Sequence, residues 1–479
     1  MKRIDRIATD MAATIKFGTS GWRAIIAEDF TFANVRLATE ATARHVLGLS
    51  PSPTLLVGYD TRFASENFAR QVANVLSAAG IRALLSNRPV PTPAVSFSVR
   101  HRKLDGAINI TASHNPGEYN GLKFSASNGA PALPEVTESI ERGIVALQKS
   151  DWKFRGTPVE DRIETIDIRD EYLRDLATKV NFEAIRKSNC RVGYDPLHGV
   201  GSGYLDYLLQ EQGLTPTVLH AGRDVYFGGS HPEPDEEKLG ELRQAVRDNN
   251  LTLGLGTDGD ADRFGILDSD GSYISPNEIL ALLLDYLVES RGWKGAVART
   301  VATTHLIDRV GELHGLEVIE TPVGFKYIGE YIEQGRIFFG GEESAGLAIQ
   351  GHLPEKDGIL ACLLVAEMVA ERGKSLRSLL KSLFDRTGEV YNQRLNIRLK
   401  PSVHKVMDAK IASDVSDFYG KKVERTDRTD GMKLIFGDGS WVLARPSGTE
   451  PVVRYYAEAS SRQELEHLIE CGKRWTTEA

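Results

Sequence analysis

One pattern recurs along this chain of 479 residues: a short apolar strand ends in a polar loop containing glycine, and an amphipathic helix follows. Strands are expected at residues 55–60, 190–195, 251–256 and 336–339, and helices at 66–79 and 203–212. The first two strands share Val-Gly-Tyr-Asp, a weak sign of internal duplication. Alternating strands and helices predict α/β domains with parallel or mixed sheets, which bind ligands at the carboxyl ends of their strands. The polar loops fall at these ends.

The end of the chain follows a different pattern. Apolar strands at 432–436 and 441–444 flank Gly-Asp-Gly-Ser, which is a hairpin signal. A third strand is expected at 452–457 and a closing helix at 462–474. We therefore predict a separate α+β domain here.

Composition narrows the functional classes. The net charge is −8 and the isoelectric point is near 5.9, so neither nucleic acid nor an anionic membrane is an expected partner. No stretch reaches the ~18 apolar residues of a membrane helix. The three cysteines form no Cys-x-x-Cys pair, which argues against a disulfide framework or a zinc site. The first residues lack the apolar core of a signal peptide, so we expect a cytoplasmic protein, with residues 1–10 a possible extension before Met11.

A dense acidic loop, Asp-Gly-Asp-Ala-Asp-Arg at 258–263, directly follows one of the predicted strands. Asp258, Asp260 and Asp262 would repel one another unless a cation or protons neutralised them, and their hard oxygens suit Mg²⁺ or Ca²⁺. An EF-hand loop is excluded, because Arg263 and Ser269 stand where that loop needs Gly and Glu. A plain acidic turn stays open as an alternative.

A second polar loop, Thr-Ala-Ser-His-Asn-Pro at 111–116, follows the predicted strand at 106–110. Ser113 is a candidate nucleophile, which would need a base or a metal for activation. The Gly-x-Ser-x-Gly elbow of serine hydrolases is absent. Local sequence leaves alternatives open: the polar residues of the loop could only form hydrogen-bonded turns, His114 could be structural, and Lys123 could be solvated.

Two more segments suit a phosphorylated sugar. Residues 445–451 supply Arg445, hydroxyls and a glycine turn for a phosphate, and Arg454 follows. Glu342 and Ser344 form an acceptor and donor pair for sugar hydroxyls. A Pro/Gly turn and a helix N-cap explain these segments equally well in isolation. Together with the serine and the aspartates, they point to phosphoryl transfer, which depends on positioning and charge neutralisation.

Five motifs in sequence order resemble the α-D-phosphohexomutase superfamily: residues 17–23, 111–116, 258–263, 341–344 and 445–451. One motif is weak, whereas five in order are specific. The resemblance implies four domains around a central cleft. Three are similar mixed α/β sheet domains, at 1–158, 159–272 and 273–385, and the fourth, at 386–479, is a C-terminal TATA-binding-protein-like α+β domain.

The resemblance also implies a role for each motif. Ser113 would carry a phosphoryl group and would bind Mg²⁺ together with Asp258, Asp260 and Asp262. Glucose 1,6-bisphosphate would be the intermediate and activator, turning over in the cleft between two half-reactions. The remaining implied positions are Lys123 as acid/base beside His114; Arg23 and Arg263 for phosphate charge; Arg445, Ser447, Gly448, Thr449 and Arg454 as the phosphate clamp; and Glu342 and Ser344 for the sugar hydroxyls.

The identity of the sugar substrate follows less directly from the sequence. Among members of the family that this chain resembles, bacterial phosphomannomutase/phosphoglucomutases and phosphoglucosamine mutases usually have Gly-His after Glu-x-Ser. Ala345-Gly346 stands here, so the histidine's role is lost or moves to His352 or Lys356. The loops around Gly324 and Lys356 look more like those of phosphoglucomutases. We therefore expect interconversion of glucose 1-phosphate and glucose 6-phosphate by a monomer or homodimer. The alternative substrates are mannose, glucosamine and pentose phosphates. The alternative functions are a metal-dependent sugar phosphatase and a non-catalytic phosphosugar-binding protein.

Overall fold

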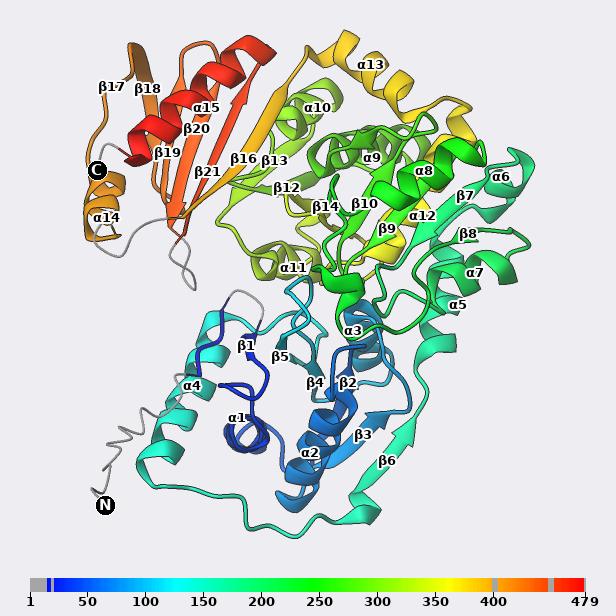
Figure 1. Ribbon diagram of the computed structural model, residues 1–479, viewed down its shortest axis with the longest axis vertical. Coiled ribbons are helices and arrows are strands. Elements are labelled where there is room, and N and C mark those ends of the chain that lie inside the picture. Colours follow the sequence, from blue (N-terminus) through cyan, green and yellow to red (C-terminus); the bar gives the residue numbers. More distant parts are fainter. Residues whose placement is uncertain (1–14, 19–20, 399–403, 447–451, 478–479) are drawn as a thin grey trace, which may run out of the picture.

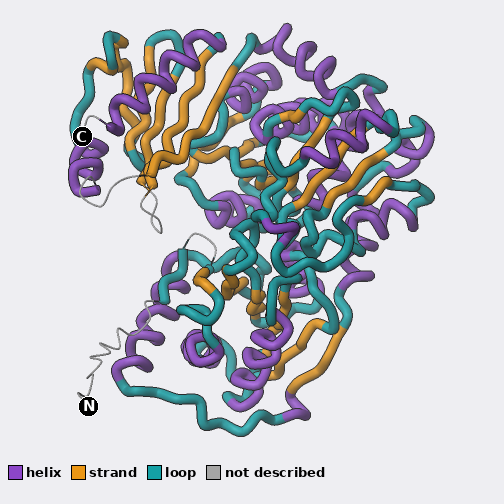
Figure 2. Tube along the Cα trace, in the orientation of Figure 1, coloured by secondary structure: helices purple, strands orange, loops and turns teal. Residues whose placement is uncertain are grey.

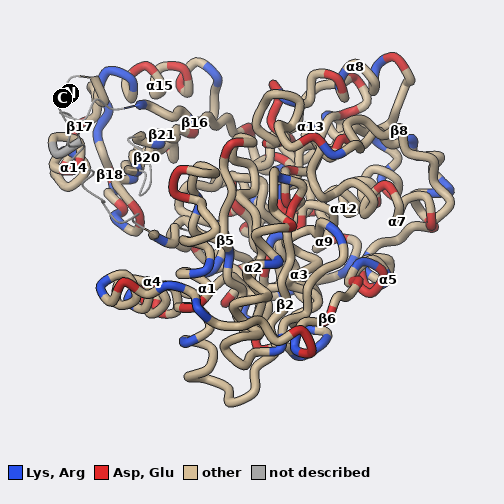
Figure 3. Tube along the Cα trace, turned by 60° about the horizontal axis from the view of Figure 1, so that its bottom comes forward, with Lys and Arg blue, Asp and Glu red and all other residues tan. Residues whose placement is uncertain are grey.

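The computed structural model describes residues 15–18, 21–398, 404–446 and 452–477, which form four sheets in sequence order (Figure 1). Three sheets are mixed and the fourth is antiparallel, so the predicted fold class is confirmed. In the described part of the chain, no helix is both long and apolar enough to cross a lipid bilayer. Acidic and basic residues are both spread along the trace (Figure 3).

Domain I is built on a six-stranded sheet of order β1-β5-β4-β2-β3-β6. Strands β2, β3, β4 and β6 are parallel, and β5 runs antiparallel to β4 and β1. The elements are β1 (Trp22–Ile25), α1 (Phe32–Leu47), β2 (Thr54–Tyr59), α2 (Ser65–Ala78), β3 (Arg82–Ser86), α3 (Thr92–His101), β4 (Gly106–Ile110), β5 (Tyr119–Ser125), α4 (Pro134–Lys149), the 3₁₀ turn η1 (Glu160–Arg162) and β6 (Ile163–Ile166). Apolar residues of α1, α2 and α4 cover one face of this sheet.

Domain II has a five-stranded sheet of order β11-β10-β9-β7-β8. Its elements are α5 (Arg169–Lys179), α6 (Phe182–Lys187), β7 (Val192–Asp195), α7 (Leu205–Glu211), β8 (Thr217–Val218), η2 (Phe227–Gly229), α8 (Gly240–Asp248), β9 (Leu253–Thr257), β10 (Phe264–Leu267) and β11 (Tyr273–Ile274). Strand β6 pairs with domain I beyond residue 158, and β11 pairs with domain II beyond residue 272. Both sheets therefore extend a few residues past the expected boundaries.

Domain III has a four-stranded sheet of order β13-β12-β14-β15. Its elements are α9 (Pro276–Arg291), β12 (Ala296–Thr300), α10 (Leu306–His314), β13 (Glu317–Thr321), α11 (Phe325–Glu333), β14 (Ile337–Glu342), β15 (Gly346–Ile349), α12 (Gly358–Arg372) and α13 (Leu376–Thr387). Helix α12 is buried along most of its length. Its apolar residues belong to one continuous core that extends from the α3 face of domain I through domains II and III.

Domain IV is an antiparallel sheet of order β16-β21-β20-β19-β18-β17, with α15 lying across one face (Figure 2). Its elements are β16 (Tyr391–Arg398), α14 (His404–Ala412), β17 (Asp417–Phe418), β18 (Lys421–Asp427), β19 (Met432–Phe436), β20 (Trp441–Pro446), β21 (Val452–Ala459) and α15 (Arg462–Thr477). This domain has its own core. A small apolar cluster of Val301, Ala302, Trp441, Leu443 and Tyr456 joins it to domain III.

Candidate active site

The acidic loop lies between β9 and β10, at the edge of domain II that faces domain I. Asp258, Asp260 and Asp262 are all buried, and their ligand oxygens lie within 4.8 Å of one another. Gly259 is required for the close approach, because a Cβ there would lie 2.5 Å from the carbonyl oxygen of Ser113. Ala261 adopts a φ of 58°, which tightens the turn. The three carboxylates therefore converge, as the sequence predicts.

Asp260 and Asp262 each have one oxygen engaged by protein donors, whereas both oxygens of Asp258 accept hydrogen bonds, Oδ1 from the backbone and Oδ2 from Ser113. The donors are the backbone N–H groups of Asp262 and Arg263 for Asp258 Oδ1; Thr92 and Lys123 for Asp260; and Lys123 and Lys356 for Asp262. The Oδ1 atoms of Asp260 and Asp262 are buried with no hydrogen-bond partner. Buried unpartnered carboxylate oxygens are costly unless a cation binds them. The oxygen donor set thus fits a hard divalent metal ion.

The electrostatics of the loop support the same conclusion. Burial and the neighbouring Asp260 and Asp262 carboxylates raise the pKa of Asp258 well above its usual range. Burial would also raise the pKa of Asp260, but the Lys123 ammonium outweighs it and the pKa is lowered. The raised pKa of Asp258 reflects repulsion among the three buried carboxylates, which a divalent cation would relieve.

Ser113 lies on the loop after β4 with its hydroxyl directed at this acidic group. The hydroxyl donates to Asp258 Oδ2 over 2.8 Å, and His114 Nδ1 lies 3.3 Å from the same Oγ. Ser113 has a φ of 53°, a left-handed conformation that a side-chain-bearing residue adopts at a cost. The fold thus joins two loops 145 residues apart in sequence. Burial and nearby cations hold the pKa of His114 well below its usual range, so its ring is neutral.

A buried arginine that sequence reasoning missed holds the Ser113 loop in place. Arg62 donates to the carbonyl oxygens of Ser113, Asn115, Pro116 and Tyr119. Its Nε lies 3.0 Å from Asp60 Oδ2, and both side chains are fully buried. The only sequence signal was an arginine in the polar loop after the first Val-Gly-Tyr-Asp strand. Charge-assisted bonds to four carbonyls fix a loop that has little regular structure of its own.

Three further cations line the same region. Burial would lower the pKa of Lys123, but Asp260 and Asp262 outweigh it and raise the pKa, so the side chain is an ammonium. Arg23 donates to Asn115 Oδ1 over 2.7 Å, next to the serine loop. Arg263 donates to Glu233 over 3.0 Å. The structure therefore places all three predicted cations around the Ser113 and aspartate loops.

The predicted sugar-reading residues lie at the end of β14. Glu342 is buried and its Oε1 accepts the backbone N–H of Gly324 over 2.9 Å. Burial and the adjacent Glu343 raise the pKa of Glu342 to about 7. Ser344 lines a cavity of about 210 Å³ among domains II, III and IV, with Arg263 on its wall. Gly324 has a φ of 135°, so glycine is favoured at this close approach.

Lys356 and His352, the two candidates for the missing histidine's role, lie in different surroundings. Lys356 Nζ lies 3.0 Å from Asp262 and 3.1 Å from Glu355, and its charge lowers the pKa of Glu342 against the effect of burial. His352 is buried between Asp175 and Asp357, 3.4 and 2.8 Å away. The structure thus distinguishes the two candidates, because Lys356 lies beside the acidic loop and His352 does not.

The predicted phosphate clamp begins at the end of β20. Arg445 donates from Nε to Asp430 Oδ2 over 2.7 Å, and its register partner on β21 is Arg454. Two arginines in register on neighbouring strands form a basic pair suited to an anion. Ser447, Gly448 and Thr449 lie outside the described residues.

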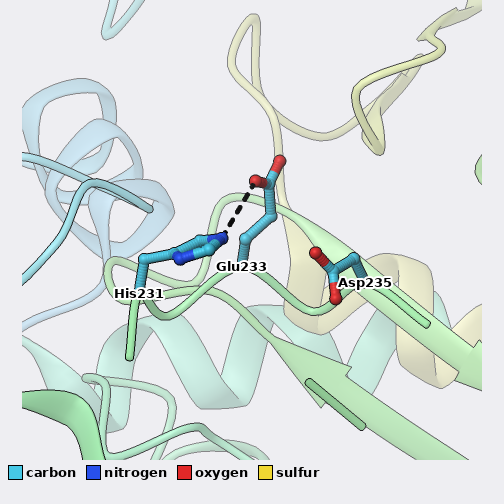
Figure 4. A group of neighbouring side chains, drawn as sticks. All are labelled: His231, Glu233 and Asp235. Atoms are coloured by element: carbon cyan, nitrogen blue, oxygen red, sulfur yellow. Dashed lines mark ion pairs between the residues drawn. The ribbon is translucent and has the colours of Figure 1, made fainter. Parts of the chain in front are cut away.

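A second acidic group lies beside the cavity but is a weaker metal candidate. The ligand atoms of His231, Glu233 and Asp235 lie within 4.8 Å of one another, and Figure 4 shows the ion pair between His231 and Glu233, which are 4.0 Å apart. Glu233 is already paired with Arg263. All three are partly exposed, whereas the Asp258 group is buried. The buried group is therefore the better metal site.

Comparison with known proteins agrees with this geometry. The phosphoglucomutase/phosphomannomutase family models match domain I at residues 14–151, domain II at 170–271, domain III at 275–387 and the C-terminal domain at 396–470.

Similar proteins cover nearly the whole chain. A phosphoglucomutase/phosphomannomutase of Thermococcus kodakarensis is 31% identical, covering 97% of this chain and 98% of its own. Phosphoglucomutase 1 of Drosophila melanogaster is 29% identical, covering 96% and 93%. The crystal structure of a candidate phosphomannomutase from Thermus thermophilus superposes with a TM-score of 0.86 at 34% identity, covering 98% of this chain and all of its own. The chain is therefore a member of the phosphoglucomutase/phosphomannomutase family, within the α-D-phosphohexomutase superfamily.

Proposed function

We propose that this phosphohexomutase is a phosphoglucomutase, which interconverts glucose 1-phosphate and glucose 6-phosphate through a phosphoserine at Ser113. The observation that carries the proposal is the 2.8 Å hydrogen bond from Ser113 Oγ to Asp258, within a buried group of three aspartates. A serine in this position can be phosphorylated beside a cation. A hydrolase triad is not the arrangement here, because the neighbouring His114 has a depressed pKa and is a poor base.

Asp258, Asp260 and Asp262 would hold Mg²⁺, with an oxygen of the serine phosphate completing the ligands. When bound, the ion neutralises negative charge that develops on the transferring phosphoryl group. The two unpartnered Oδ1 atoms, on Asp260 and Asp262, are the observation that supports this binding.

Each half-reaction moves one phosphoryl group between Ser113 and a sugar hydroxyl. In the first, the bond from phosphorus to Ser113 Oγ breaks and a bond to the sugar oxygen forms, and the proton that the sugar hydroxyl gives up is balanced by the one that the freed Ser113 Oγ takes up. This gives glucose 1,6-bisphosphate. In the second, Ser113 Oγ attacks the other phosphate and the sugar oxygen leaves with a proton. The hydrogen bond from Ser113 to Asp258 marks the direction in which the serine proton departs.

The surrounding cations would serve charge and proton transfer. Lys123 is held as an ammonium by two aspartates, so it suits proton donation to the leaving sugar oxygen. Arg23 and Arg263, both near enough to His114 to lower its pKa, would stabilise charge on the phosphate. Neutral His114 would accept or donate one hydrogen bond to Ser113.

Binding the second phosphate away from Ser113 explains the layout. Arg445 and Arg454, with Ser447, Gly448 and Thr449, would hold whichever phosphate is not reacting. Glu342 and Ser344 would bind sugar hydroxyls, with Gly324 shaping the loop beside them. The bisphosphate would turn over between half-reactions, so that the same clamp receives either end.

The preference for glucose rests on the resemblance of the loops around Gly324 and Lys356 to those of phosphoglucomutases. Lys356 also packs on Gly346, the position at which a histidine is expected, because a Cβ there would lie 2.7 Å from the Lys356 Cδ. The test is to compare kcat/KM for the 1-phosphates of glucose, mannose, glucosamine and ribose. A larger value for any sugar other than glucose overturns the preference but leaves the mutase intact. Release of free phosphate in place of hexose 6-phosphate would identify a phosphatase instead.

Phosphorylation of the serine is tested separately. Intact-mass measurement before and after treatment with glucose 1,6-bisphosphate should show one added phosphoryl group, absent in Ser113→Ala. A mass increase that persists in Ser113→Ala would place the acceptor elsewhere.

A further inference from the structure

Asp430 joins two parts of the site that lie in different domains. It lies in the turn between β18 and β19 of domain IV, and its Oδ2 accepts two hydrogen bonds. One comes from Arg445 Nε, 2.7 Å away in the same domain, and the other from the backbone N–H of Val323, 3.1 Å away in domain III. A single oxygen atom therefore links the clamp arginine to the loop between β13 and α11.

The link continues into the sugar-reading group. Gly324 follows Val323, and its backbone N–H donates to Glu342 Oε1 over 2.9 Å. Successive peptide groups of one short loop thus contact Asp430 on one side and Glu342 on the other. Because φ at Gly324 is 135°, the loop adopts a conformation in which a larger residue is strained. A shift of Val323 would therefore move the donor that positions Glu342.

Asp430 is held firmly enough to transmit such a contact. Gly431 has a φ of 97°, and a Cβ there would lie 2.5 Å from the carbonyl oxygen of Ala444, so the turn packs closely on β20. Lys433, three residues after Asp430, is fully buried. Its Nζ donates to the carbonyl oxygen of Val301 over 2.8 Å and to Glu320 over 3.0 Å, both in domain III. These contacts fix the turn against both domains.

The geometry also determines how Arg445 is presented. Asp430 takes the Nε–H, so this ion pair does not use the two terminal nitrogens of the guanidinium. A guanidinium held through Nε keeps its plane fixed, which favours bidentate binding of a phosphate. The side chain of Asp430 is 24% exposed and that of Arg445 is 14% exposed, so solvent only partly screens the pair.

We propose that Asp430 is a positioning residue that couples the phosphate clamp of domain IV to the sugar-reading loop of domain III. It orients Arg445 toward the phosphate and, through Val323 and Gly324, holds Glu342 for the sugar hydroxyls. Phosphate and sugar are then recognised as one unit. The inference rests on the proposed function, because it assigns a role within the same site.

The test compares Asp430→Ala and Asp430→Asn with the wild type. Glucose 1-phosphate is the probe, with KM and kcat from turnover and Kd from calorimetry. Loss of a charge-assisted link is expected to raise KM and Kd about tenfold or more in Asp430→Ala. The value of kcat per folded molecule should change much less. Asp430→Asn keeps an acceptor in place and should recover part of the loss. If Asp430 only stabilised the fold, Asp430→Ala would lower the folded fraction and therefore the apparent kcat, but it would not change KM.

Asp438→Asn is the matched control. Asp438 also lies in a turn of the domain IV sheet, accepts the backbone N–H of Ser440 over 3.0 Å and pairs with Lys421 over 2.7 Å, but at the β19–β20 turn. Its KM should stay within about twofold of the wild-type value, as for a surface substitution. A KM increase in this control equal to that of Asp430→Ala overturns the proposal, because the effect would then be general to the domain.

A double-mutant cycle with Glu342→Gln tests the coupling itself. If the two residues act through one loop, Glu342→Gln should raise KM less in the Asp430→Ala background than in the wild type. Fully additive effects, or an unchanged Kd in a folded Asp430→Ala protein, overturn the proposal. A wild-type protein that binds glucose 1-phosphate without turnover refutes the mutase activity, while the Kd comparison still decides the role of Asp430. A wild-type protein that binds none of it overturns both.

Discussion

Replacing Glu342 by Gln should make the protein more stable at alkaline pH while impairing its chemistry. Burial and Glu343 raise the carboxyl pKa from its ordinary value of 4.5 to about 7. One pKa unit corresponds to about 1.4 kcal/mol, so the ionised side chain costs the folded state about 3 kcal/mol. Gln keeps an oxygen that can accept the Gly324 N–H, which Glu342 accepts over 2.9 Å, and it carries no charge. The substitution therefore removes the penalty without removing the contact.

The sign of the pH dependence follows from linkage. Because the folded pKa lies above the unfolded one, the stability contributed by protonated Glu342 is fully present below pH 4.5 and is lost as the pH rises through about 7. The stability gain of Glu342→Gln over the wild type should therefore be largest at pH 8. At pH 5 it should fall to less than about 1 kcal/mol.

Thermal unfolding at pH 5 and pH 8, without sugar phosphate, measures this difference. Unfolding entropy is about 2 cal/mol/K per residue, so for 479 residues unfolding as one unit a gain of about 3 kcal/mol raises Tm by about 3 °C. Glu312→Gln, at an exposed position on α10 of the same domain, is the control and should leave Tm unchanged at both pH values. A Tm for Glu342→Gln that is no higher than wild type at pH 8, or that rises equally at pH 5, would refute the assigned cause. The same variant should lose kcat/KM for glucose 1-phosphate.

The remaining predictions concern the chemistry directly. Ser113→Ala should abolish mutase turnover and leave Tm unchanged within a few degrees; substantial residual activity would exclude the phosphoserine route. Removal of divalent cations by a chelator should stop turnover, and Mg²⁺ should restore it; full activity in the chelator would remove the metal from the reaction. Arg445→Ala should weaken hexose phosphate binding by about 1.5–3 kcal/mol, seen as a higher KM; unchanged steady-state constants would remove Arg445 from the clamp. Lys356→Met should change the ratio of kcat/KM for glucose and mannose 1-phosphates, whereas His352→Gln should not; the reverse pattern would reassign the sugar-reading role to the histidine.

The fold was predictable because its signals are local. Apolar runs such as 55–60 and 251–256 are bounded by glycine and polar residues, and the hairpin at 432–444 carries its own turn sequence. The helices expected at 66–79 and 462–474 occur as Ser65–Ala78 and Arg462–Thr477. The boundaries of the first two sheets were harder to predict, since β6 and β11 are short edge strands. Strand β6 pairs with β3, about 80 residues away, and β11 has only two residues.

The site was only partly predictable, because its contacts join distant segments. A serine and an aspartate 145 residues apart carry no sign in the sequence that one donates to the other. The residues that hold the site were missed for the same reason. Arg62 looks like an ordinary loop cation, and Asp430 like an ordinary Asp-Gly turn; their partners lie on other loops or in another domain. The roles of the predicted site residues stay predictions until the variants are assayed.

The carbonyl contacts of Arg62 have a consequence for the order of events during turnover. With four loop carbonyls tied to one buried guanidinium, the backbone around Ser113 is anchored in domain I by the Arg62–Asp60 pair. Arg445, in contrast, belongs to domain IV, which has its own core and contacts domain III through the small Trp441 cluster and through Asp430 and Lys433. Any opening that lets the sugar rotate should then occur on the domain IV side, with the serine as the stationary point. The two ends of the hexose would then reach the same fixed Ser113 Oγ in turn, so both half-reactions would use one position of the serine.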